Sequence, residues 1–245
     1  MVTHEIDLSR ARWWIPKRVE RDELIDSPDQ PVEDFRQSFG DLRTINRLFV
    51  GTSVVIFRLS ELIRSSRKET TVLDVATGSA DIPRALLKWA RSRGLLLHVT
   101  GVDANATILQ LARDDSMGDP DLDFAQCDAM ALPYTDNSFD YVLSSLTFHH
   151  FSDEEAVKAL TEMNRVTRCG LIVNDLRRAY LPAALIWLVT RVLRMNRMTR
   201  HDGPLSVLRS RTVAEYQALA TRSGLTAEVH KHPFWRVALV VRKRA

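Results

Sequence analysis

The stretch Val72-Leu73-Asp74-Val75-Ala76-Thr77-Gly78-Ser79-Ala80-Asp81 decides the fold of this 245-residue chain. An apolar run passes through a turn of small residues and leads into a predicted helix, which is how a nucleotide-binding α/β domain begins. A dinucleotide-binding turn would read Gly-x-Gly-x-x-Gly and hold an anionic pyrophosphate on the helix N-terminus. Here Gly78 stands without the other two glycines, and Asp74 and Asp81 would repel a pyrophosphate.

The two aspartates favour a cationic ligand instead. S-adenosylmethionine (SAM) carries a sulfonium and an ammonium and has no phosphate, so its charge suits this turn and that of NAD does not. Polar residues after the next strands support this interpretation. Asp103 ends the second predicted strand, where a carboxylate can accept from both ribose hydroxyls, and Asp128 follows the third, where it can accept from the adenine amino group.

Strands and helices alternate downstream of the turn, which predicts a parallel sheet. The expected further strands are 95–102, 122–126, 141–146, 169–174, 225–231 and 234–241, the last two forming an antiparallel hairpin at the sheet edge. The expected helices are 81–93, 105–113, 154–165 and one that ends at residue 222. Two of them begin with capping boxes, Ser152 with Glu155 and Thr212 with Glu215.

These motifs, together with Leu132-Pro133-Tyr134-Thr135-Asp136-Asn137-Ser138-Phe139-Asp140, resemble the class I methyltransferases over roughly residues 71–173. The resemblance is greatest to the ubiquinone/menaquinone-biosynthesis type, with its Leu-Pro-Phe-x-Asp-x-x-Phe-Asp signature. It implies a Rossmann-like, mostly parallel seven-stranded sheet with helices on both faces and an antiparallel last strand. Many relatives have glycine where this chain has Ala76 and Ala80. Because alanine disfavours positive φ, we expect a slightly displaced turn or ordinary φ at both alanines.

The resemblance also implies a helical lid over the substrate side at residues 1–67, followed by a SAM-binding domain at 68–245 with a helical insertion at 176–211. Phe35, Phe39, Leu42 and Ile45 recur at helical spacing in the lid, and Gly51 is a candidate break between two helices. A fainter resemblance, through 41–47, 174–178 and 201–209, is to bacterial methyltransferases that accompany type III polyketide synthases. That resemblance implies secondary metabolism and methylation of a phenolic or polyketide-type acceptor on oxygen.

Histidines 149 and 150 follow the fourth strand, at the end of the sheet where α/β domains bind ligands. Histidine is the side chain best suited to take a phenolic or carboxylic proton near neutral pH, so both are candidates for the catalytic base. A structural histidine bonded to backbone is the alternative. His201 and Asp202 are a candidate hydrogen-bonded pair of side chains. The following Gly203-Pro204 equally indicates a loop that ends a helix.

The insertion is basic: between Arg177 and Arg211 there are eight arginines and one acid, which leaves the rest of the chain at −4 within a total of +3. A basic excess confined to one segment does not indicate nucleic-acid binding. An apolar run, 181–193, precedes arginines at three-residue steps, so the segment 177–211 is a candidate for substrate cover or for peripheral contact with anionic lipid. Packing in the core is the alternative for its apolar face.

Two cysteines give neither a disulfide framework nor metal-ligand spacing. The N-terminus is polar and has no apolar segment of a signal peptide, so we expect a cytoplasmic protein. We also expect a monomer or homodimer that acts on a small hydrophobic substrate without a metal. The residues assigned to catalysis are His149 and His150. Those assigned to SAM or its product S-adenosylhomocysteine are Asp74, Ala76, Thr77, Gly78, Asp81, Asp103, Ala104, Asp128, Ala129 and Ser145. Those assigned to the substrate are Trp13, Trp14, Phe148, Arg177, His201 and Arg209.

The sequence leaves three alternatives to oxygen methylation. The first is methylation of a quinol ring carbon, for which the same histidine base would serve. The second is a non-catalytic domain that holds the cofactor or a lipid. The third, an NAD-dependent oxidoreductase, is disfavoured by the chemistry of the turn.

Overall fold

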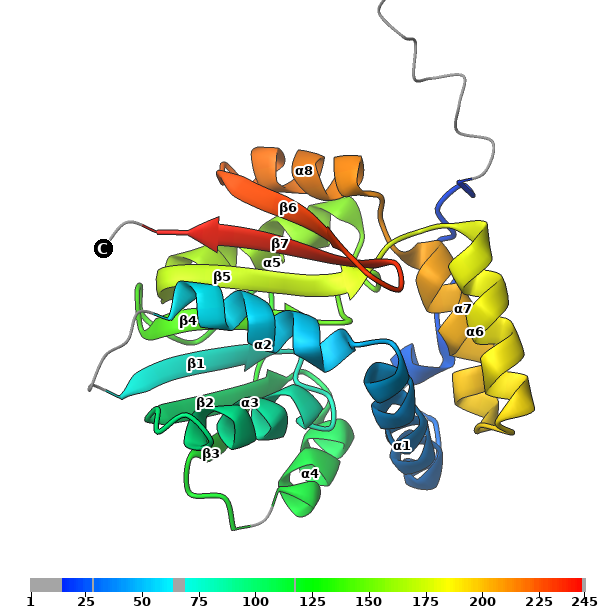
Figure 1. The fold of residues 1–245 in the computed structure, drawn as a ribbon, viewed down its shortest axis with the longest axis horizontal. Coiled ribbons are helices and arrows are strands. Elements are labelled where there is room, and N and C mark those ends of the chain that lie inside the picture. The colour runs from blue at the N-terminus through cyan, green and yellow to red at the C-terminus, as the bar shows by residue number, and fades with distance from the viewer. Residues whose placement is uncertain (1–14, 28, 64–68, 117, 244–245) are drawn as a thin grey trace, which may run out of the picture.

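A computed structural model describes residues 15–27, 29–63, 69–116 and 118–243. Its centre is a seven-stranded sheet in the order β3-β2-β1-β4-β5-β7-β6 (Figure 1). The strands are β1 Thr70–Val75, β2 Leu97–Asp103, β3 Leu122–Gln126, β4 Phe139–Ser145, β5 Thr167–Leu176, β6 Ala227–His232 and β7 Arg236–Arg242. β7 runs antiparallel to both of its neighbours, and the pairs among β1 to β5 are parallel. The predicted sheet is confirmed, with ends that differ by a few residues.

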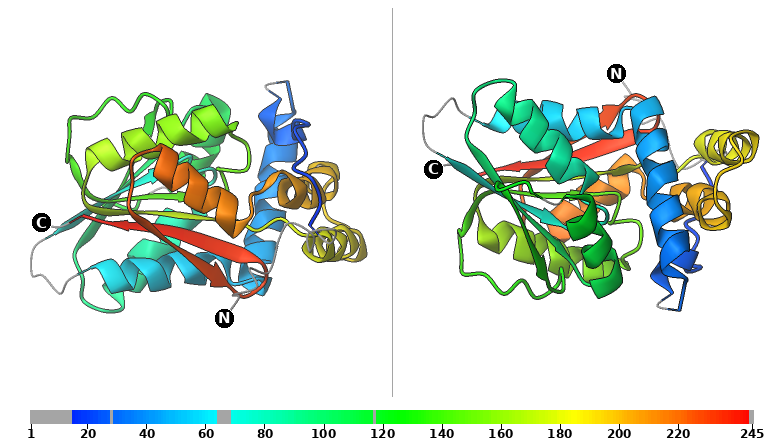
Figure 2. Two further views of the ribbon diagram at one scale, coloured as in Figure 1. Left: turned by 90° about the horizontal axis from the view of Figure 1, so that it is seen from above. Right: turned by 90° about the horizontal axis from the view of Figure 1, so that it is seen from below.

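Helices cover both faces of the sheet and one of its ends (Figure 2). They are α1 Val32–Leu48, α2 Gly51–Leu62, α3 Asp81–Arg91, α4 Ala106–Asp115, α5 Asp153–Val166, α6 Tyr180–Val192, α7 Arg197–Arg209 and α8 Val213–Arg222. Leu59 of α2 and Leu86 of α3 are buried in the core on one face, and Leu160 of α5 and Leu219 of α8 on the other. Both capping boxes that the sequence predicts are formed, at the starts of α5 and α8.

Three helices stand beyond the carboxyl ends of the parallel strands. α1 lies across this end of the sheet, α7 packs against α1, and α6 packs against α7 (Figure 2). Gly51 does separate two helices, as predicted, but they take different places. α1 lies over the strand ends where a lid is expected, whereas α2 packs against β5 and β7. The division into a lid at 1–67 and a domain at 68–245 stays a prediction, and α2 shares the core of the domain.

α6 buries one side and exposes the other. Pro182 and Ala183 are buried, while Leu181, Trp187, Leu188 and Val192 are each about half exposed or more. Core packing therefore accounts for part of its apolar surface and leaves the outer part uncovered. Among the described helices, none combines the length and apolarity that crossing a bilayer requires.

Candidate functional site

The turn after β1 has left-handed backbone at three alternate residues. φ is 57° at Ala76, 56° at Gly78 and 58° at Ala80. Alanine rarely adopts such angles, so the expectation of ordinary φ at both alanines is wrong. The turn is held in this shape by its surroundings: the Thr77 amide donates to the Val102 carbonyl at 2.8 Å. The chain therefore makes a tight glycine-type turn with two alanines and keeps their backbone strain.

Asp103 joins this turn to the loop that follows β2. Its Oδ2 accepts from the Gly78 amide and its Oδ1 from the Asn105 amide, both at 3.0 Å. Burial raises the pKa of Asp103, and the backbone hydrogen bonds oppose that rise. One hydrogen bond per oxygen leaves further lone pairs on a carboxylate that lines a cavity.

Asp74 lies behind the turn and not on the cavity wall. It is 2% exposed, and its Oδ2 accepts from Thr77 Oγ1 at 2.8 Å. Burial raises the pKa of Asp74 to about 7. The assignment of Asp74 to direct cofactor contact is therefore corrected: its side chain supports the turn from the core side.

The cavity measures about 530 Å³, within the usual size of ligand sites. It begins at the turn and extends beneath α1, α6 and α7. With Asp74 set aside, the residues assigned to the cofactor all line it: Ala76, Thr77, Gly78, Asp81, Asp103, Ala104, Asp128, Ala129 and Ser145. Its apolar wall includes Phe39, Leu42, Ile45, Phe49, Leu185 and Ile186. Cofactor motifs and an apolar chamber thus share one space.

The acids at the turn end of the cavity differ in how far their charge is already paired. Asp81 forms an ion pair with Arg84 at 2.6 Å and lies 3.6 Å from Arg43. Asp128 accepts one hydrogen bond at Oδ1, from the Met130 amide at 2.9 Å. Asp103 and Asp128 are therefore the carboxylates best placed to receive donors from a ligand, and Asp81 serves the start of α3.

His149 is fixed by a buried carboxylate. Its Nδ1 lies 2.8 Å from Asp175 Oδ1, and its backbone amide donates to Asp175 Oδ2 at 3.0 Å. Burial would raise the pKa of Asp175, but the charge of His149 and hydrogen bonds outweigh it and the pKa falls below its ordinary value. The Asp175 carboxylate occupies Nδ1 of His149, which leaves Nε2 as the ring nitrogen that faces Glu23 and the cavity.

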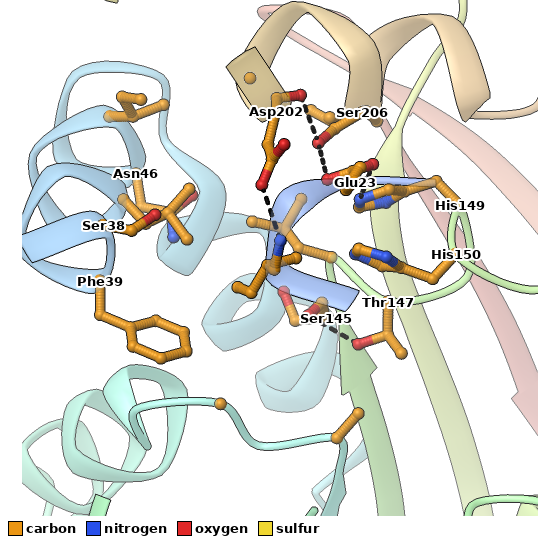
Figure 3. Close-up of a pocket in the computed structure, with 18 of the residues that line it drawn as sticks. Glu23, Ser38, Phe39, Asn46, Ser145, Thr147, His149, His150, Asp202 and Ser206 are labelled. Atoms are coloured by element: carbon orange, nitrogen blue, oxygen red, sulfur yellow. Dashed lines mark hydrogen bonds and ion pairs between the residues drawn. The ribbon is translucent and has the colours of Figure 1, made fainter. Parts of the chain in front are cut away.

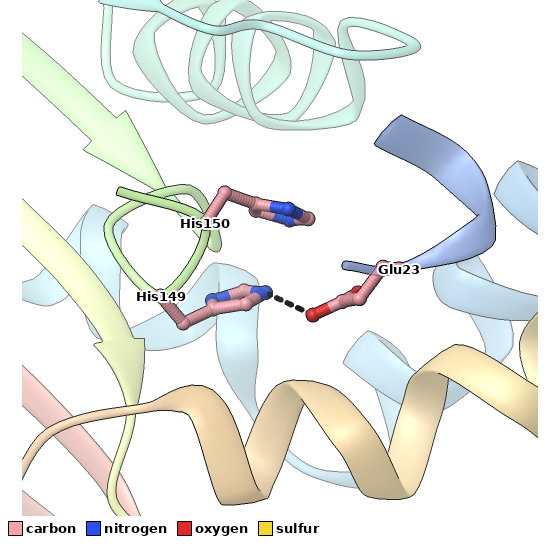
Figure 4. A group of neighbouring side chains, drawn as sticks. All are labelled: Glu23, His149 and His150. Atoms are coloured by element: carbon pink, nitrogen blue, oxygen red, sulfur yellow. Dashed lines mark ion pairs between the residues drawn. The ribbon is translucent and has the colours of Figure 1, made fainter. Parts of the chain in front are cut away.

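Glu23 approaches that Nε2 from the segment before α1. Its Oε1 lies 3.7 Å from His149 Nε2, and its Oε2 accepts from Ser206 Oγ at 2.7 Å (Figures 3 and 4). Burial raises the pKa of Glu23 to about 7. The carboxyl group therefore changes charge near neutral pH right beside the histidine.

His150 stacks on His149, with ring centroids 4.3 Å apart (Figure 4). Its Nδ1 lies 2.8 Å from Asp26 Oδ1. One ligand atom from each of Glu23, His149 and His150 lies within 4.8 Å of the others, so the three could hold a divalent cation such as zinc. The Asp175 contact to His149 is the kind that orients a metal-bound imidazole. The expectation of a metal-free site therefore stays a prediction.

Two substrate assignments, Phe148 and Arg209, are corrected by the structure. Phe148 is 1% exposed and packs in the core that also holds Leu160 and Leu219, so its ring does not reach the cavity. Arg209 is buried and donates to the carbonyls of His149 and His150, so its guanidinium is occupied by the backbone. Arg177 does line the cavity. Trp13 and Trp14 fall outside the described residues.

The His201–Asp202 pair forms as the sequence predicts, at 2.7 Å between Nδ1 and Oδ1. It lies within α7, since Pro204 stands inside that helix, and the expected helix-ending loop is absent there. Of the two residues, Asp202 lines the cavity. Its carboxylate accepts from the amides of Leu24 and Ile25 at 2.8 and 3.0 Å, which ties the segment carrying Glu23 to α7.

Comparisons with known proteins point to methyltransferases. Residues 72–170 match the family described as "Methyltransferase domain". The demethylmenaquinone methyltransferase of Staphylococcus aureus is 36% identical over 107 residues, an alignment that covers 44% of this chain and 42% of that protein. The chain thus aligns with less than half the length of this curated relative.

Solved structures share the fold. A SAM-dependent methyltransferase from Aquifex aeolicus superposes with a TM-score of 0.58 at 19% identity, covering 87% of this chain and 98% of that one. Human N-acetylserotonin methyltransferase in complex with SAM gives a TM-score of 0.52 at 16% identity, covering 71% of this chain and 48% of that one. The domain match and the shared fold show that residues 72–170 resemble the methyltransferase domain of class I, Rossmann-like enzymes. Within that class, this domain resembles the menaquinone-biosynthesis group.

Proposed function

We propose that this protein is a SAM-dependent methyltransferase that methylates an oxygen of a small, hydrophobic acceptor of the phenolic or polyketide type. The observation that carries the proposal is one continuous cavity. It joins the turn at Asp103 to the ring of His149 and then to an apolar wall under α1 and α6. A cofactor, a base and a non-polar acceptor can therefore meet in one space, which a domain that merely bound the cofactor would not require.

The residues at the turn end fit SAM. Asp103 has lone pairs left for the two ribose hydroxyls, and Asp128 can accept from the adenine amino group. Both are carboxylates, which favours a cationic cofactor over a phosphorylated one. When bound, SAM supplies an electrophilic methyl group on a sulfonium, and no protein group has to activate that methyl.

His149 supplies what an oxygen nucleophile needs. In the proposed reaction its Nε2 takes the proton of the acceptor hydroxyl, and the resulting imidazolium is stabilised by Asp175 at 2.8 Å from Nδ1. SAM held by Asp103 and Asp128 would supply the methyl group to that oxygen and would leave as S-adenosylhomocysteine. Orientation of the two reactants in the cavity would supply much of the rate.

A second candidate is methylation of a quinol ring carbon. It is favoured by the alignment with a demethylmenaquinone methyltransferase over 44% of this chain. The same base would serve it, because a quinol must also lose a hydroxyl proton before its ring carbon becomes nucleophilic. The two candidates therefore differ in the product and not in the residues that assist.

The outer face of α6 suggests where such an acceptor comes from. Leu181, Leu188 and Val192 are 51–67% exposed, and Arg191 stacks on the half-exposed ring of Trp187 at 4.2 Å. The inner face of the same helix lines the cavity through Pro182, Leu185 and Ile186. We propose that this face touches an anionic lipid surface, which would place the cavity next to a source of hydrophobic substrate.

The test of the proposed activity is transfer of labelled methyl from SAM to a panel of long-chain resorcinols, hydroxybenzoic acids and quinols, with the methylated atom identified. A methyl ether or ester supports oxygen transfer. A methyl on a ring carbon refutes it in favour of the quinol candidate. Tight binding of S-adenosylhomocysteine without a product from any acceptor class would refute both in favour of a cofactor-binding domain.

A further inference from the structure

Arg236 is a buried guanidinium with free donors. It begins β7, is 1% exposed and lines the cavity. Its Nη2 donates to Asn46 Oδ1 at 2.8 Å, while Nε and Nη1 have no hydrogen-bond partner among the described protein groups. Burial lowers the pKa of Arg236 to about 10, against a smaller opposing effect of Asp175. A buried guanidinium with unpaired N–H donors destabilises the fold unless an anion binds to it.

Arg177 adds a second guanidinium at the same place. It follows Leu176, the residue of β5 that pairs with Arg236, and its amide donates to the Trp235 carbonyl at 2.7 Å. It lines the same cavity, and its Nε also lacks a hydrogen-bond partner in the described part of the chain. Two arginines at the ends of neighbouring strands thus bring unused N–H donors to one wall.

This wall lies apart from the cofactor turn. β4 and β5 separate β1 from β7 in the sheet. Three strand spacings of about 4.8 Å put the two strand ends on the order of 14 Å apart. The acids Asp81, Asp103 and Asp128 lie at the turn, and the two arginines lie on the far side of the histidines. The cavity is therefore negative at the end that suits a cationic cofactor and positive at the other.

We propose that Arg236, together with Arg177, binds a carboxylate carried by the acceptor. The inference rests on the proposed function and narrows its substrate class to hydrophobic hydroxy acids, in place of neutral phenols. A guanidinium suits this role because it stays charged when buried and offers several donors to a carboxylate. The hydrophobic neighbours Phe49 and Leu146 line the same cavity and would contact the rest of the acceptor.

The same donors could take the carboxylate of SAM itself, so the experiment separates the two sources. Protein saturated with S-adenosylhomocysteine is titrated calorimetrically with 2-hydroxy-6-heptylbenzoate and with 3-heptylphenol, which lacks the carboxylate. The expected result is that the acid binds at least about tenfold more tightly than the phenol. Arg236→Gln should abolish that preference, with phenol affinity within about twofold of the unchanged protein. Arg36→Gln, an exposed arginine on α1, is the matched control and should keep the preference.

Thermal melting separates binding from folding. Because Arg236 is a buried charge without an anion, Arg236→Gln without ligand should melt no lower than the unchanged protein; if it fails to fold, Arg177→Gln takes its place in the titration. Equal affinity of the unchanged protein for both acceptors would overturn the proposal. So would a loss of S-adenosylhomocysteine affinity in Arg236→Gln, since the arginine would then bind the cofactor. Failure of the proposed function would appear separately, in the labelled-methyl assay, as a ring-carbon methyl or as no product. If S-adenosylhomocysteine does not bind, the acid–phenol pair is titrated into the free protein.

Discussion

Removal of the Asp103 carboxylate tests the cofactor end of the site. Each oxygen of Asp103 already accepts one backbone amide, from Gly78 or Asn105, at 3.0 Å. Each therefore has a lone pair left, one for each ribose hydroxyl. A hydrogen bond to a charged group contributes about 1.5–3 kcal/mol, so the loss of even one raises the dissociation constant by roughly 10- to 150-fold. Asp103→Ala should weaken S-adenosylhomocysteine binding by at least that lower bound.

The assay is calorimetric titration of S-adenosylhomocysteine, with melting temperature measured alongside because the substitution also frees two turn amides. Asp123→Ala is the control, since that aspartate is 72% exposed on β3 and contacts His98. It should bind the ligand as the unchanged protein does. An Asp103→Ala variant that is folded and binds within about threefold of the unchanged protein would refute the assignment of ribose to this carboxylate.

Three further predictions concern the base, the acid beside it and the exposed helix. His149→Gln should lower turnover by about a hundredfold or more while S-adenosylhomocysteine affinity holds, and an unchanged rate would remove it as the base. Burial raises the pKa of Glu23 from 4.5 to about 7, so its contribution to stability is present below 4.5 and lost as pH rises through about 7. Glu23→Gln should therefore raise the melting temperature more at about pH 8 than at about pH 5, and equal shifts would contradict the buried-acid assignment. The pair Leu181→Glu and Leu188→Glu should abolish flotation with phosphatidylserine vesicles, while Phe57→Glu, at an exposed side chain of α2, should not. Flotation that survives the pair, or that the unchanged protein does not show, contradicts lipid contact by α6.

Much of the sheet could be predicted because its signals are local. The capping residues Ser152 and Thr212 each indicate the start of a helix, and the apolar runs between them indicate strands and helices. Each of these signals depends on only a few neighbouring residues. Residues that line the turn end of the cavity could be predicted in the same way, since βα loops of a parallel sheet meet at one edge. Pro204 shows the limit: as a breaker it predicts a loop, yet tertiary packing keeps it inside α7.

The end of the cavity that holds Glu23 and Arg236 could not be predicted, because it is assembled from segments that are distant in the sequence. Glu23 contacts His149 across more than a hundred residues, and nothing near Glu23 in the sequence marks it as part of a site. Arg236 reads as an ordinary charged residue at the start of a strand, and only its burial and its free donors distinguish it. The assignment of Arg209 to substrate failed for the converse reason, since backbone carbonyls occupy it.

The loop that carries both histidines is fastened from outside the matched domain. Carbonyl groups of residues 148–151 accept from Arg209 and Arg211, and Arg18 donates to Phe151 O at 2.6 Å. None of these arginines belongs to the matched segment 72–170, and neither does Asp175. A chimera that grafted this segment alone into another methyltransferase would therefore inherit the cofactor turn and both imidazoles but no anchor for them. The smallest transferable unit of this candidate site is therefore discontinuous in sequence, and it includes residues 18–26 and 175–211.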